Sequence, residues 1–129
     1  QQKCSISLHI QVLPETWQTG MDLIDLTRIL GILIDNAIEE VLLVPDGIIE
    51  VRITGNACGC SYTIRNSVTP RTIQQGIHAG INTKGEGRGK GLSTVRELLS
   101  PYHNATLNSC LQGDIFIQSL TLSWQDPLS

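Results

Sequence analysis

The chain has 129 residues, of which 40% are hydrophobic and 16% are charged, and its formal net charge is −3. A chain of this length forms one domain with a single core and needs neither disulfides nor a metal for stability. Its hydrophobic content excludes wholesale disorder, and its apolar stretches are too short to cross a membrane. An aromatic content of 4% and a negative net charge argue against a nucleic-acid surface built on basic charge and base stacking.

The first two elements in chain order are a strand and a long helix. Between Ile6 and Val12 apolar residues alternate with polar ones, which predicts a strand with one face on the core and His9 on the exposed face. From Asp22 to Val44 the spacing predicts one long helix or two successive helices. These end before Pro45-Asp46-Gly47, a turn-forming triplet that cannot continue a helix.

The later elements surround a glycine-rich stretch. Two alternating apolar runs, Ile48–Ile53 and Cys60–Ile64, flank a Gly/Asn turn and predict a β-hairpin. From Asn66 to Gly91 the chain loses clear periodicity and holds six of its 12 glycines. Helical spacing predicts a helix from about Leu92 to Leu99, and two last strands follow at Ala105–Leu111 and Ile115–Trp124.

The long helix carries an amide beside its core face. On a helical wheel the predicted core stripe consists of Leu26, Ile29, Leu33 and Ala37. Asn36 lies about 60° from that stripe, where an unpartnered polar group costs about 1–3 kcal/mol. Either a neighbouring backbone carbonyl or a ligand therefore satisfies its amide. Glu39 and Glu40, one turn further on, are typical of a solvated helix face.

The segment Thr83–Leu92 combines four alternate glycines with three cations ahead of a helix. Backbone amides without side chains, followed by a helix N-terminus, make an anion site, and Lys84, Arg88 and Lys90 add positive charge. Phosphate is the natural ligand. The glycine spacing fits neither a Walker A loop nor a dinucleotide-binding fingerprint. The alternative is a mobile surface loop whose charges aid solubility.

Together these segments resemble a known family. Leu30–Glu40 (LGILIDNAIEE) is similar to the N-box of the GHKL ATP-binding superfamily of gyrase, Hsp90, MutL and histidine kinases, and Gly87–Leu92 (GRGKGL) resembles its second glycine box. The motif order is most similar to that of the peptide-quorum-sensing histidine kinases, the accessory-gene-regulator and competence receptors. The resemblance runs from Leu8 to Trp124. It implies an α/β two-layer sandwich, a Bergerat-type mixed sheet with helices packed on one face.

The resemblance also implies ATP and Mg²⁺ as cofactors. Asn36 would bind a Mg²⁺ ion that bridges the nucleotide phosphates, because an amide oxygen is the hard ligand this ion prefers. Asn66 falls where ordinary histidine kinases place the Asp that accepts a hydrogen bond from the adenine amino group. The remaining ATP-binding residues would form the hinge and cradle of a nucleotide lid, with two cations near the phosphates: Lys84, Gly85, Gly87, Arg88, Gly89, Gly91 and Leu92.

Three positions depart from the family pattern. The usual Asp-x-Gly-x-Gly is here Asn66–Pro70, without either glycine, so adenine recognition is built differently. Ile32 stands one turn before Asn36, where the superfamily's hydrolases carry a glutamate base, which predicts negligible ATP hydrolysis. Glu39 replaces a lysine that many sensor kinases have, which removes one possible phosphate contact.

Residues 1–129 are thus expected to be a single catalytic and ATP-binding domain, a fragment of a bacterial membrane receptor that lies on its cytoplasmic side. It would supply the γ-phosphate to a histidine on a separate dimerisation helix, since His9, His78 and His103 lack an acceptor context. The expected partners are that dimerisation domain and, through the full kinase, a response regulator, with no nucleic acid and no direct membrane contact. The alternatives are a nucleotide-independent regulatory module and an anti-sigma-type serine kinase.

Overall fold

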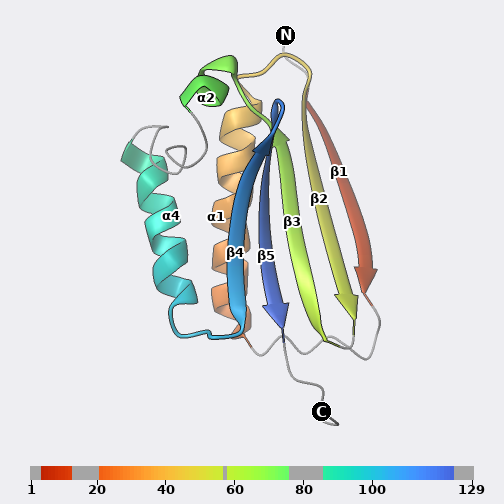
Figure 1. Ribbon diagram of the computed structural model, residues 1–129, viewed down its shortest axis with the longest axis vertical. Coiled ribbons are helices and arrows are strands. Elements are labelled where there is room, and N and C mark those ends of the chain that lie inside the picture. The colour runs from red at the N-terminus through yellow and green to blue at the C-terminus, as the bar shows by residue number, and fades with distance from the viewer. Residues whose placement is uncertain (1–3, 13–20, 57, 76–85, 124–129) are drawn as a thin grey trace.

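The computed structural model describes residues 4–12, 21–56, 58–75 and 86–123 (Figure 1). Its elements are β1 (Cys4–Val12), α1 (Leu23–Val41), β2 (Gly47–Asn56), β3 (Gly59–Ser67), α2 (Pro70–Gln75), α4 (Glu86–Leu99), β4 (Ala105–Gln112) and β5 (Ile115–Ser123). The two longer helices, α1 and α4, lie side by side on one face of the sheet (Figure 1). The predicted two-layer sandwich is therefore confirmed. No helix among the described elements is long and apolar enough to cross a membrane.

The sheet is mixed, with the strand order β1-β2-β3-β5-β4. β1 pairs with β2 in parallel, which needs a crossover connection, and α1 provides it. The other three pairings are antiparallel, including the predicted hairpin of β2 and β3. α1 and β3 run towards the same end of the molecule, and α4 starts at that end (Figure 1).

α1 is one continuous helix and ends at Val41, before the predicted breaker. It begins after Asp22, whose Oδ1 accepts a hydrogen bond of 2.8 Å from the backbone N–H of Ile24. Such a cap satisfies a backbone donor that the helix itself leaves without a partner. The predicted core stripe is confirmed, because Leu26, Ile29, Leu33 and Ala37 are all buried. They join the core with residues of β2, β3, β5 and α4.

The prediction that β1 packs one face on the core is wrong. Ile6, Leu8 and Ile10 are 65%, 60% and 58% exposed. In the parallel register Ile6 lies opposite Ile49 and Leu8 lies opposite Val51, so these residues share the helix-covered side of the sheet. β1 is an edge strand, however, and α1 packs on β2 and β3. Alternation thus predicts which residues share a face, but not whether another layer covers it.

The helices after β3 also differ from the prediction. α2 forms within a stretch that shows no helical periodicity, and α4 begins at Glu86 instead of near Leu92. Gly87, Gly89 and Gly91 therefore lie within a helix and not in a loop before it. A glycine costs a helix about 1 kcal/mol relative to alanine. We attribute the longer helix to tertiary packing, since α4 packs on α1 and its added residues include Gly91, which approaches Ile32 of α1.

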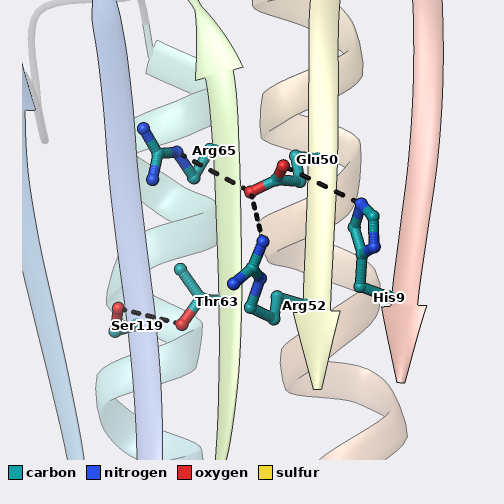
Figure 2. A network of polar contacts seen from close by, with 6 residues as sticks. All are labelled: His9, Glu50, Arg52, Thr63, Arg65 and Ser119. Carbon is teal, nitrogen blue, oxygen red and sulfur yellow. Dashed lines mark hydrogen bonds and ion pairs between the residues drawn. The ribbon is translucent and has the colours of Figure 1, made fainter. Parts of the chain in front are cut away.

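The opposite face of the sheet is polar in its centre (Figure 2). The carboxylate of Glu50 lies 3.9 Å from the nearest nitrogen of His9, of Arg52 and of Arg65. His9 is exposed, as predicted, and its contact is with this carboxylate. Pairs of this length on a solvated surface contribute about 0–1 kcal/mol each. We therefore assign this cluster to the solvated surface of the sheet and not to the candidate site.

Tyr102 ties the beginning of α1 to the turn before β4. Its hydroxyl donates to Asp25 Oδ2 over 2.6 Å and accepts from the backbone N–H of Asp22 over 3.2 Å. The hydrogen bond to Asp25 raises the pKa of Tyr102. Burial also raises the pKa of Tyr62 on β3. These are the two tyrosines of the chain, so both phenols resist ionisation in the folded state.

We expect the native chain to show less than half of its tyrosinate absorbance at pH 10, whereas the urea-unfolded chain is half ionised near its usual pKa of about 10. The folded state favours both protonated phenols. Their contribution to stability is therefore complete below about pH 10 and is lost as pH rises through the folded pKa values. A spectrophotometric titration of native and unfolded protein measures this difference. Superimposed titration curves would contradict the two raised pKa values.

Candidate functional site

The candidate residues come from elements that meet at one end of the helix-covered face. Asn36 lies in the C-terminal half of α1, Asn66 near the end of β3, and Gly91 in α4. α2 lies at the same end (Figure 1). The crossover through α1 and the return of the chain through α4 thus bring residues that are far apart in sequence to the same end of the molecule.

α4 approaches α1 closely at Gly91. A Cβ atom placed on this glycine would lie 3.3 Å from Cγ2 of Ile32 and 3.9 Å from Oδ1 of Asn36. The contact with Ile32 is tighter than ordinary van der Waals packing, so glycine permits the approach. The last glycine of the sequence motif and the N-box amide are therefore neighbours.

Asn36 is half-buried, and its side chain makes no hydrogen bond with the residues that the structure describes. The sequence left two possible partners for this amide, a backbone carbonyl or a ligand. In the described part of the chain no backbone carbonyl takes this role. An amide in this position gains by meeting a ligand, because a polar group that leaves water without a partner lowers stability. Its role as an Mg²⁺ ligand stays a prediction.

Asn66 is 1% exposed and lies on the helix-covered side of β3. It stands between Ile49 of β2 and Phe116 of β5 in the strand register. Its Nδ2 donates to the carbonyl oxygen of Ser67 over 3.0 Å, which fixes the orientation of the amide. Oδ1 accepts no hydrogen bond from the described residues. Among the described residues, the buried atom of Asn66 that has no partner is therefore an acceptor.

Gln118 of β5 is a buried polar residue that the sequence reasoning missed. It is opposite Ile64 in the register and diagonal to Asn66 on the same side of the sheet. Within the described ranges its amide has no hydrogen-bond partner. The sequence did contain a signal for its burial. Gln118 alternates with Phe116 and Leu120, and such an alternation places its residues on the core side of a strand.

The segment in place of the first glycine box is held by β2 and by the turn between β4 and β5. The backbone N–H of Ile48 donates to Ser67 Oγ over 3.0 Å. The backbone N–H of Val68 donates to the carbonyl oxygen of Asp114 over 3.0 Å. These two hydrogen bonds therefore hold the chain immediately after Asn66, where the family pattern has glycines.

Glu40 was expected on a solvated helix face, and this expectation is wrong. It is 1% exposed and accepts hydrogen bonds from the backbone N–H of Thr69 and from the hydroxyl of Thr72. Thr72 is itself buried. The sequence did not indicate these hydrogen bonds, because Glu40 is adjacent to the exposed Glu39 and is about 30 residues away from Thr69 and Thr72.

The other predicted binding residues are placed only in part. Lys84 and Gly85 lie outside the described residues. The backbone of Gly87, Arg88 and Gly89 belongs to the start of α4, at the end of the molecule where β3 ends (Figure 1). Leu92 is buried in the core. The ATP-binding roles of all these residues remain predictions.

Comparison with solved structures finds histidine kinase domains. The nucleotide-free catalytic domain of histidine kinase ThkA has a TM-score of 0.66 and 17% identity, over 92% of this chain and 79% of that one. AdeS of Acinetobacter baumannii has a TM-score of 0.61 and 18% identity, over 92% and 54%. The histidine kinase domain of the Erythrobacter litoralis blue-light-activated kinase EL346 has 0.57 and 14%, over 91% and 54%. At these identities the likeness shows the fold.

No curated protein sequence matches this chain. A family model described as the GHKL domain matches residues 21–123. This range begins just before α1 and ends with β5, so it includes both Asn36 and Asn66. The chain therefore belongs to the GHKL domain family.

Proposed function

We propose that this chain is the ATP-binding catalytic domain of a sensor histidine kinase. The observation that carries the proposal is the pair of amides at one end of the helix-covered face. Asn66 has a buried acceptor atom and Asn36 a half-buried side chain, and neither of these has a hydrogen-bond partner in the described part of the chain. A GHKL domain whose fold resembles histidine kinase catalytic domains supports the assignment.

The residues present fit a nucleotide with Mg²⁺. Oδ1 of Asn66 would accept a hydrogen bond from the adenine amino group, since its Nδ2 is already engaged with Ser67. Asn36 would bind Mg²⁺ through its amide oxygen. The N-terminus of α4, whose first backbone N–H groups have no acceptor within the helix, and the cationic Arg88 would attract the phosphates. ATP, when bound, supplies the phosphoryl group that is transferred.

The chain's own residues would position the nucleotide and would not activate water. Ile32 lies beside Gly91 near Asn36 and has no group that could accept a proton. We therefore infer negligible ATP hydrolysis by the chain alone. The acceptor histidine would lie on a dimerisation helix outside this chain, and a response regulator would receive the phosphoryl group. Peptide quorum sensing through a membrane receptor is the setting that the motif order favours.

Calorimetry with adenylyl imidodiphosphate and Mg²⁺ tests ATP binding. We expect saturable binding by the 129-residue chain. Absence of binding at millimolar nucleotide would reject the ATP site and favour the nucleotide-independent module. A separate transfer assay should offer ATP to a longer protein that includes the proposed dimerisation helix. Phosphate on a serine of a separate partner, instead of on that protein's histidine, would favour the anti-sigma-type kinase.

A further inference from the structure

The buried carboxylate of Glu40 connects α1 to the segment that follows Asn66. Glu40 lies one helical turn after Asn36 on α1. Its Oε1 accepts hydrogen bonds from the backbone N–H of Thr69 over 3.0 Å and from the hydroxyl of Thr72 over 2.7 Å. A buried carboxyl group is costly unless it is hydrogen-bonded, so these two bonds favour one arrangement of the segment.

These bonds complete the cap of α2. The Oγ1 of Thr69 accepts from the backbone N–H of Thr72 over 3.1 Å, and Pro70 occupies the first helical position. In a common capping box, a Glu three residues after the cap bonds back to the N–H of the capping residue. Thr72 stands at that position here, and the N–H of Thr69 is instead bonded by Glu40. The carboxylate of the cap thus comes from a different helix.

The Thr69 hydroxyl also donates to the Thr72 hydroxyl over 3.1 Å, which in turn donates to Glu40. Hydrogen bonds in such a chain polarise and strengthen one another. Because α1 carries Asn36 and the segment begins with Asn66, the network links the element proposed to hold Mg²⁺ to the element proposed to hold the base. The glycines that usually shape this segment are absent.

We propose that Glu40 is a positioning residue for base recognition, which holds the segment from Asn66 to Thr72 in place relative to α1. This inference rests on the proposed function as an ATP-binding domain. Glu40 acts through Thr69 and Thr72 and does not touch the nucleotide. Its contribution therefore falls on the base and not on the triphosphate.

The test compares the affinities of the chain for adenylyl and guanylyl imidodiphosphate, both with Mg²⁺. We expect the wild-type chain to prefer the adenine nucleotide, because Oδ1 of Asn66 accepts from an amino group and not from the keto oxygen of guanine. In Glu40→Ala we expect about a tenfold loss of affinity for the adenine nucleotide and an adenine-to-guanine preference near one. Glu40→Gln should retain the preference, since its amide oxygen can accept the same two bonds.

Thr72→Val keeps the shape of the side chain and removes the donor of the 2.7 Å bond, so it tests the same link if Glu40→Ala fails to fold. We expect it to reduce the preference less than Glu40→Ala does. Glu97→Ala, an exposed glutamate on α4, is the matched control and should change neither affinity. An equal loss for both nucleotides in the Glu40 or Thr72 variants, no loss, or a wild-type chain without base preference would overturn the inference. A wild-type chain that binds neither nucleotide would reject the proposed function itself.

Discussion

Replacement of Asn36 by alanine is expected to lower the affinity for adenylyl imidodiphosphate with Mg²⁺ at least tenfold, which corresponds to about 1.4 kcal/mol or more. The reason is the loss of the oxygen ligand that would hold Mg²⁺ against the phosphates. Alanine suits a helix, and Asn36 makes no hydrogen bond with the described residues, so the variant should fold normally. Calorimetry measures the affinity, and thermal unfolding without ligand checks the fold.

Removal of the metal provides the internal comparison. With a chelator present, wild type and Asn36→Ala should bind the nucleotide with the same, weaker affinity, because the amide then has no ion to hold. Asn108→Ala, an exposed asparagine on β4, is the control and should bind like wild type. If Asn36→Ala keeps the full affinity with Mg²⁺, the metal-binding role of this residue is wrong, whereas the ATP site as a whole is not.

Replacement of Leu33 by alanine is expected to lower the free energy of unfolding by about 2–5 kcal/mol. Leu33 is 0% exposed and lies on the core stripe of α1, one turn before Ala37. The change removes buried apolar surface and leaves a cavity that the close-packed core fills only in part. A domain of this size has a stability of about 5–15 kcal/mol, so the loss is a large share of the total.

Urea unfolding at equilibrium measures this loss. Leu23→Ala is the matched control, because Leu23 belongs to the same helix but is 73% exposed. It should change the stability by less than about 0.5 kcal/mol. Similar effects of the two substitutions would contradict the assignment of Leu33 to the core. The folded fraction of Leu33→Ala should retain the Mg²⁺ dependence of nucleotide binding, since Asn36 is intact.

Local patterns predicted the elements that are both regular and covered. The helix from residue 23 to residue 41 has a complete apolar stripe and a breaker after it, and the β2–β3 hairpin has alternating strands around a short turn. The sequence failed where the covering layer decides the outcome. β1 has the alternation of a core strand, yet its apolar residues Ile6, Leu8 and Ile10 are exposed, because no described helix packs over this strand.

The candidate site divides in the same way. The N-box amide Asn36 and the acceptor Asn66 were predicted from motifs, because their residue types and order are visible along the chain. Glu40 and Gln118 were not predicted. Their burial depends on α2, whose helix has no periodic signal, and on the pairing of β5 with β3. The burial of both residues thus depends on contacts between segments that are far apart in the sequence.

The sequence by itself determined the fold class, the core stripe of α1 and the family resemblance, since periodicity and motif order are properties of the chain. Only the tertiary structure decided that α4 begins at Glu86 and approaches α1 at Gly91, and that Glu40 is buried against Thr69 and Thr72. The physical reason is that a glycine-rich segment has a weak intrinsic preference, so packing against its neighbours decides its conformation. A carboxylate, likewise, leaves water only where another segment supplies its hydrogen bonds.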